Sequence, residues 1–188
     1  ILLLSPVRIT ELCAKTSPVT DSNGNVIDNP FSYLQLYNAS NRDIALDGYY
    51  TRLWHTTGRA PSDARMLKLD GAVIKAGGTL TLWRKPEGSN LTVEDFNRRY
   101  GVMLKENEDI LVSEQNFISS SNDGRRLEVM FGTETLARVE YNFGKGVGRD
   151  IVTDRAIVFD LQPNMTGTAR ILTTTAKPSP GGLRMSLD

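Results

Sequence analysis

The sequence is poor in the residue types that most often build catalytic and metal sites. Its 188 residues include one cysteine and one histidine. A single cysteine cannot form an intramolecular disulfide, so a hydrophobic core has to hold the fold, and the chain is long enough to bury one. Transition-metal sites of the His/Cys type need several such ligands. The composition therefore predicts no metal site of that class.

Net charge and long apolar runs are missing as well. The 22 basic side chains are balanced by 22 acidic ones. Because the chain has no overall positive field, we expect no strong nucleic-acid binding at physiological salt. No apolar run reaches the roughly 20 residues of a membrane-spanning helix, so no transmembrane segment is expected. The first residue is Ile1 rather than methionine, which suggests either a processed protein or a shortened chain.

Short runs of alternating apolar residues, separated by turn clusters, make up most of the chain. Residues 32–37 and 79–83 both alternate, as half-buried strands do. The side chains of residues 33, 35 and 37 are then expected on the outer face. Several such runs predict an all-β sandwich or barrel. The core residues predicted from the alternation are Leu34, Leu36, Leu80 and Leu82.

One segment has a different period. Thr92 is followed three residues later by Asp95, an arrangement like a capping box. Val93, Phe96 and Tyr100 then recur at helical spacing. These features predict one short helix at about 92–100, inserted between strands and capping one end of the sandwich. The domain core is expected to span about residues 7–175, and residues 176–188 to form a terminal tail rich in proline and glycine.

Catalysis by the single histidine or cysteine finds little support in the sequence. His55 is expected at a strand end, and no Gly-x-Ser-x-Gly signature is present. Cys13 lies in the apolar run Leu12-Cys13-Ala14, which favours a small buried side chain over a nucleophile. A hydrolase would instead need carboxylates that converge in a cleft, and the spacing leaves this open. The candidates are Asp63, Asp70, Glu106, Glu108 and Asp109.

Two loops have alternative interpretations as ligand sites. Asp21-Ser22-Asn23-Gly24-Asn25, with Asp28 beyond it, is first of all a hairpin turn. Its oxygen-bearing residues Asp21, Asn23, Asn25 and Asp28 also form a weak candidate for a Ca²⁺ site. Residues 144–149, Gly-Lys-Gly-Val-Gly-Arg, superficially resemble a phosphate-binding loop. Such a loop needs a helix after it, and an extended segment follows, so an ordinary loop is the preferred interpretation.

The tryptophans suggest a further class of function. If Trp54 and Trp83 were exposed on one face, they could stack on sugar rings. That arrangement would make the domain a carbohydrate-binding module. The competing interpretation is that these aromatic side chains pack in the core.

Several segments, taken in order, resemble the lamin-tail domain family. The resemblance covers about residues 7–181, and it is the order and spacing of the motifs that makes it specific. The motifs are Ser32-Tyr33-Leu34-Gln35-Leu36-Tyr37-Asn38, Leu46-Asp47-Gly48-Tyr49-Tyr50, Val73-Ile74-Lys75-Ala76-Gly77-Gly78-Thr79-Leu80, Asn122-Asp123-Gly124-Arg125-Arg126-Leu127 with Ala137-Arg138-Val139-Glu140-Tyr141, and Lys177-Pro178-Ser179-Pro180-Gly181. Two features depart from the family: Gln35 stands where it often carries glutamate, and the stretch 85–118 is longer than usual.

The resemblance implies an immunoglobulin-like β-sandwich. Because the chain has no rod heptads, the bacterial members of the family fit better than the nuclear lamins. It further implies a non-catalytic interaction or targeting module of an exported or cell-surface protein, hence an extracytoplasmic location. The expected partner is a protein or a cell-surface glycan. A carbohydrate-binding module and a hydrolase domain remain the alternatives.

Overall fold

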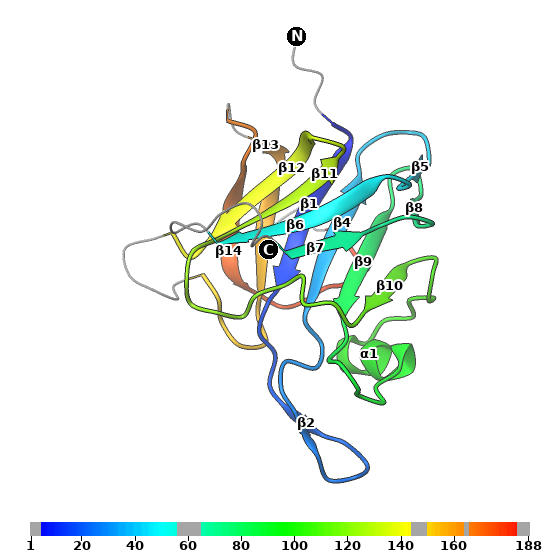
Figure 1. Ribbon diagram of the computed structural model, residues 1–188, viewed down its shortest axis with the longest axis vertical. Helices are drawn as coiled ribbons and strands as arrows, with labels where there is room; N and C mark the ends of the chain where they lie inside the picture. The colour runs from blue at the N-terminus through cyan, green and yellow to red at the C-terminus, as the bar shows by residue number, and fades with distance from the viewer. Residues whose placement is uncertain (1–4, 56–64, 144–149, 164–165, 184–188) are drawn as a thin grey trace.

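The computed structural model describes residues 5–55, 65–143, 150–163 and 166–183 (Figure 1). This part of the chain forms fourteen strands and one helix, which confirms the prediction of an all-β protein with a single short helix. The elements in chain order are β1 (Val7–Cys13), β2 (Val19–Thr20), β3 (Val26–Ile27), β4 (Tyr33–Asn38), β5 (Ile44–Ala45), β6 (Tyr49–His55), β7 (Arg65–Lys68), β8 (Val73–Ile74), β9 (Thr79–Arg84), α1 (Val93–Tyr100), β10 (Ile110–Ser113), β11 (Arg125–Phe131), β12 (Glu134–Tyr141), β13 (Ala156–Pro163) and β14 (Ala169–Ala176).

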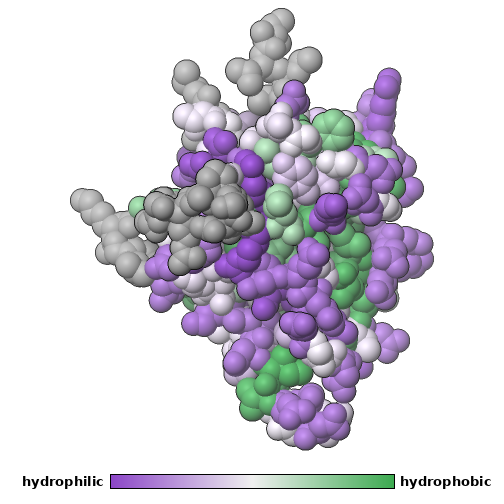
Figure 2. Space-filling model, viewed as in Figure 1, coloured by the Kyte–Doolittle hydropathy of each residue, from purple (hydrophilic) through white to green (hydrophobic). Residues whose placement is uncertain are grey.

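Two main sheets form the sandwich. The larger one has the strand order β10-β9-β4-β1-β13-β14, and the smaller one has the order β12-β11-β6-β7. All neighbouring strands are antiparallel except β9 and β10, which run parallel. The pairs β2–β3 and β5–β8 form separate two-stranded ribbons. The β2–β3 hairpin extends from the body of the molecule, and hydrophobic surface is exposed there, including Val26 at 67% (Figures 1 and 2).

The main core lies between the two sheets. All four predicted core leucines belong to it, and none is more than 2% exposed. From the smaller sheet, Leu53, Leu127 and Val129 complete the same cluster. The register aligns Leu34 with Leu82 and Leu36 with Leu80, so these pairs sit directly opposite each other on the inner face.

Much of the outer side of β4 in the six-stranded sheet is buried too, so the prediction that this strand is half-buried is wrong. Tyr33 and Gln35, on the outer side of β4, are 0% and 1% exposed. A second apolar cluster covers this face, formed by Tyr33, Cys13 and Trp83 with Phe96 of the helix. The stretch 85–118 therefore supplies a cover for the sheet, rather than only a cap at one end of the sandwich.

The helix itself is as predicted. It begins after Thr92, whose hydroxyl accepts from the Asp95 N–H while the Asp95 carboxylate accepts from the Thr92 N–H, a complete capping box. It ends at Gly101, which has a φ of 66°. Glycine adopts this left-handed conformation without the steric cost that a side chain would bring.

The C-terminal segment, expected as a tail rich in proline and glycine, is bound to the sheet through residues 179–182. Ser179 donates from its N–H and its hydroxyl to the Glu11 carboxylate at 2.8 and 2.9 Å. Gly181 N–H donates to Gln35 Oε1 at 2.8 Å, and Gln35 Nε2 donates to the Gly182 carbonyl at 2.9 Å. Residues 179–182 thus cover the middle of β1 and β4. Residues 184–188 lie outside the described part of the chain.

Shortening one core leucine tests this packing. We expect Leu36→Ala to lower the free energy of unfolding by about 2–5 kcal/mol, because Leu36 is buried in the main core and truncation leaves a cavity. Urea denaturation followed by circular dichroism measures the change. The matched control is Val26→Ala on the exposed hairpin, for which less than about 0.5 kcal/mol is expected. Equal losses in the two variants would contradict the packing described here.

Candidate functional site

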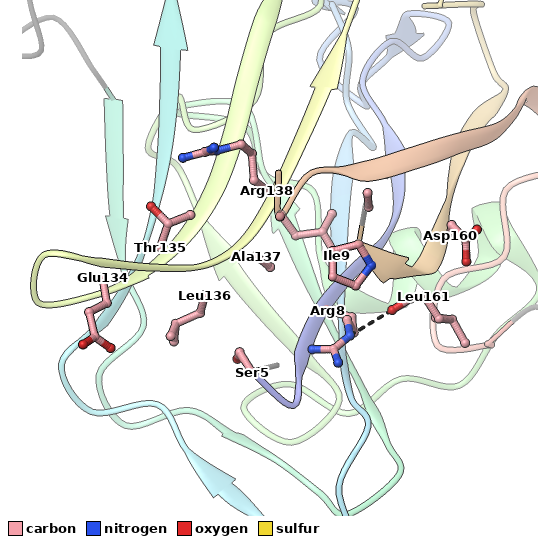
Figure 3. A pocket seen from close by; sticks show the side chains of 13 residues that line it. Ser5, Arg8, Ile9, Glu134, Thr135, Leu136, Ala137, Arg138, Asp160 and Leu161 are labelled. Carbon is pink, nitrogen blue, oxygen red and sulfur yellow. Dashed lines mark hydrogen bonds between the residues drawn. The ribbon is translucent and has the colours of Figure 1, made fainter. Parts of the chain in front are cut away.

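A cleft opens at the end of the sandwich where β1 and β12 begin and β13 ends (Figure 3). Its volume is about 350 Å³, within the range of small ligand sites. It separates the edge strand β12 from β1 and the β13–β14 hairpin. The residues that line it are Ser5, Arg8, Ile9, Glu134, Thr135, Leu136, Ala137, Arg138, Asp160, Leu161, Pro163, Gly167 and Ala169.

The cleft combines apolar walls with a cation. Leu136 and Ala137 on β12 and Ile9 on β1 contribute apolar lining to the cleft (Figure 3). Arg8 is held at the rim, where Nε donates to the Leu161 carbonyl at 2.9 Å. Burial lowers the pKa of Arg8 from its usual value, and within the described ranges no carboxylate forms a salt bridge with it. The walls therefore suit a ligand with an apolar part, and Arg8 is placed to meet a negative group, while the carboxylates Glu134 and Asp160 also line the cleft.

A charged network occupies the outer face of the four-stranded sheet. At its centre Glu128 is 1% exposed. Arg52 on β6 and Arg138 on β12 flank it in the register, and each forms a salt bridge of 3.1 Å with it. Thr135 and Trp54 also donate to this carboxylate. Burial alone would raise the pKa of Glu128, but these hydrogen bonds outweigh it and hold the pKa below its ordinary value.

The two tryptophans do not form a sugar-binding platform. Trp83 is 0% exposed; its Nε1 donates to the Pro30 carbonyl at 2.9 Å and its ring stacks with Phe31. Trp54 lies on the opposite sheet, partly buried, with the Arg52 guanidinium 4.3 Å from its ring centroid. The idea that both are exposed on one face is therefore wrong, and the core interpretation of Trp83 is confirmed.

The reactive side chains that the sequence singled out have structural positions. Cys13 is 0% exposed, which confirms its interpretation as a small buried side chain. Burial raises the pKa of its thiol to about 12, so it is protonated at neutral pH and not a nucleophile. His55 is the last residue of β6, a strand end as expected, and it stands opposite Arg125 in the ladder.

The candidate cation loop is a tight hairpin turn. Asp21 Oδ1 accepts from the N–H groups of Asn23 and Asn25 at 2.9 and 2.8 Å, and Oδ2 accepts from Asn25 Nδ2. These bonds lower the pKa of the Asp21 carboxyl. The turn interpretation is confirmed. Asp28 follows the short strand β3 and is exposed.

The scattered carboxylates have similar roles in turns. Asp70 accepts from the Gly48 N–H at 2.7 Å, and Asp109 accepts from the Lys105 N–H at 3.0 Å. Among the described residues, no group of three or more His, Cys, Asp or Glu side chains is placed to hold a metal ion. Asp63 and the glycine-rich loop 144–149 lie outside the described residues.

Comparison with known proteins gives one informative match. No family model matches the chain. An alignment of 132 residues, which covers 64% of this chain, shows 26% identity to the uncharacterized protein YvnB of Bacillus subtilis (strain 168). The match covers 10% of that protein, so this chain spans only about a tenth of its bacterial relative. In the described residues, no helix has both the length and the apolar character needed to cross a membrane.

The Glu128 network predicts a dependence of stability on pH. The lowered pKa means that ionised Glu128 stabilises the folded state above its unfolded pKa, and that this contribution is lost as the pH falls through the folded value. We expect Glu128→Gln to cost about 1–3 kcal/mol at neutral pH, because Arg52 and Arg138 lose their charged acceptor. The variant should also lose less stability than the wild type on acidification below about pH 5.

Denaturant unfolding at a series of pH values measures both effects. The control is Glu140→Gln, which removes a more exposed carboxylate paired with Arg126 on the same sheet. It should cost less than about 1 kcal/mol. Parallel pH profiles for wild type and Glu128→Gln would contradict the assignment.

Proposed function

We propose that this chain is a non-catalytic interaction module of the lamin-tail type, part of a larger bacterial protein that acts outside the cytoplasm. The ordered motifs, which resemble that family, support the type. The two-sheet sandwich is the architecture that the resemblance implies. The match to one tenth of a long bacterial protein is consistent with a module among other domains.

The observation that carries the non-catalytic assignment is the state of the two buried carboxylates. Glu11 accepts from Tyr33 and Ser179, and Glu128 accepts from two arginines, Thr135 and Trp54. A general acid or base needs a free approach to a substrate proton. Both carboxylates are instead surrounded by donors of the protein itself and are at most 2% exposed. Their hydrogen bonds and salt bridges connect neighbouring strands and attach the C-terminal segment to the sheet.

The cleft of Figure 3 is the proposed binding surface, and its proposed occupant is an extended segment of a partner polypeptide. β12 is an edge strand, and in the described chain it pairs beyond β11 only through a single bridge between Arg138 and Thr168. An exposed edge can accept another strand by backbone hydrogen bonds. An apolar side chain of that strand would lie against Ile9 and Leu136, and an acidic one would meet Arg8.

Glycan binding ranks behind peptide binding for a structural reason. The tryptophan pair on which that alternative depends is split between two sheets, with Trp83 enclosed in the core. One face of Trp54 is already covered by Arg52. The cleft itself has no described aromatic side chain in its lining.

Filling the cleft tests the binding surface. Peptides selected from a random display library on the wild-type domain should bind at least about tenfold more weakly to Ala169→Trp, because the indole occupies the space between β12 and β14. The control Ala76→Trp adds the same bulk on an exposed turn outside the cleft and should bind as the wild type does. Fluorescence anisotropy measures the affinities. If the selected peptides bound Ala169→Trp as tightly as the wild type, the cleft would not be their binding site.

Assays for turnover test the non-catalytic assignment. The purified domain should show no hydrolysis of phosphoesters, peptides or glycosides above background with Mg²⁺, Mn²⁺, Ca²⁺ or Zn²⁺. His55→Ala serves as the comparison, since His55 is the only histidine. Turnover that disappears in this variant would identify a histidine-dependent enzyme, and turnover that persists would point to a carboxylate site. Either result would overturn the proposal.

A further inference from the structure

Three arginines gather at the end of the sandwich opposite the cleft. Arg65 opens β7, Arg84 closes β9 and Arg125 opens β11. The pairing of Arg65 with Leu53 puts Arg65 on the inner face of the smaller sheet. Arg125 and Arg84 lie two residues from the core leucines 127 and 82, and strand alternation directs them to the same interior. Both sheets thus direct guanidinium groups into the space where the hydrophobic core ends.

This arginine cluster is short of negative charge. The described residues provide one carboxylate in salt-bridge range, Asp123 at 3.5 Å from Arg125, and its side chain is 68% exposed. Arg65 donates to the Asn116 carbonyl at 3.3 Å, and Arg125 donates to the Gly124 carbonyl at 3.0 Å. Carbonyl groups supply hydrogen bonds but do not neutralise the cations.

Two buried guanidinium nitrogens have no hydrogen-bond partner in the described chain. They are Nε of Arg84 and Nε of Arg125, and Arg125 as a whole is only 4% exposed. A buried donor without an acceptor destabilises the fold, and a buried cation does so more strongly. The pKa of Arg65 is lowered by burial first and then by repulsion from Arg125 and Arg84, partly offset by Tyr141. Arg65 is therefore close enough to Arg125 and Arg84 to be repelled by both.

A polar hollow of about 310 Å³ adjoins this cluster. Arg65 and Arg84 form part of its wall, and the rest is mainly hydroxyl and amide side chains. Asn29 donates to the Ser120 hydroxyl at 3.2 Å, which links the segment after β3 to the segment before β11. The other lining residues are Ala14, Asn116, Ile118, Ser119 and Ser121.

We propose that the arginine cluster and its hollow form a binding site for a tetrahedral oxyanion, a phosphate or sulfate group. Guanidinium groups form paired, charge-assisted hydrogen bonds with such anions. Donors arrive here from several strands and from the serine segment, so an anion with four acceptor oxygens fits better than a carboxylate with two. The anion would supply the acceptor that Nε of Arg84 lacks, and it would offset the positive charge of Arg65 and Arg84, which both line the hollow.

Calorimetry and thermal unfolding of the whole chain test the site in a buffer without phosphate. Inorganic phosphate or sulfate should raise the melting temperature more than chloride at equal ionic strength, because only a bound ligand stabilises by mass action. Binding of phosphate should weaken at least about tenfold in Arg84→Met and less in Arg84→Lys, which keeps the charge without the guanidinium fork. Glycerol 3-phosphate distinguishes a phosphate ester from the free ion, and tighter binding of either one identifies the source.

The matched control is Arg126→Met, which removes the next arginine along β11. Arg126 lies on the outer face and pairs with Glu140, so the variant should bind phosphate as the wild type does. In chloride, Arg84→Met should be no less stable than the wild type, because it removes one of three repelling cations. A chloride effect equal to that of phosphate, or undiminished phosphate binding in both Arg84→Met and Arg65→Met, would overturn the proposal.

Discussion

The six-stranded sheet has to be covered on both faces, and most of the structure follows from that constraint. Its inner face packs against the smaller sheet, as in any β-sandwich. Its outer face carries Tyr33, Trp83 and Cys13, which would be exposed if the domain were only two sheets. The helical insertion puts Phe96 over this apolar part of the surface. The C-terminal segment covers the neighbouring polar part, where Glu11 and Gln35 need hydrogen-bond partners.

The elements of the fold could be predicted because they depend on local patterns. The alternation in β4 and β9 identified the core leucines, and Thr92 with Asp95 identified the start of the helix. The alternation could not show that the outer side of β4 is also covered by other parts of the chain. Tyr33 and Gln35 look like outward residues of a half-buried strand, and only the position of residues 93–104 and 179–182, far away in sequence, buries them.

The candidate sites were less accessible to sequence reasoning for the same reason. The residues that line the cleft come from the segments 5–9, 134–138, 160–163 and 167–169. These segments share no sequence motif. The arginines of the cluster are separated by 19 residues or more in the sequence. A signal did exist: each stands at one end of an otherwise apolar inward series, as Arg84 does after Leu80 and Leu82 and Arg125 does before Leu127. A charged residue at such a position marks where a core stops, but its partners depend on the register of both sheets.

The two ends of the sandwich consequently differ in character. At one end, edge strand β12 and the β13–β14 hairpin leave a cleft with apolar walls. At the other, the strands end in cations, and the space between the sheets is lined by polar groups. A network on the outer face of the smaller sheet holds Glu128 between two arginines and pairs Arg126 with Glu140, so positive charge there is largely compensated. The interior cations at the polar end have much less compensation.

The position of β1 has a consequence for how the chain folds as it is made. β1 is the first strand in the sequence, yet it lies between β4 and β13, and its Glu11 is bound by Ser179, 168 residues away. During synthesis from the N-terminus, β1 can pair with β4 early, but its other edge stays open until residues 156–163 emerge. Contacts over such sequence separations form slowly. The nascent domain therefore carries an unpaired inner strand until residues 156–163 have been made, a stage at which binding by a chaperone would protect it from aggregation.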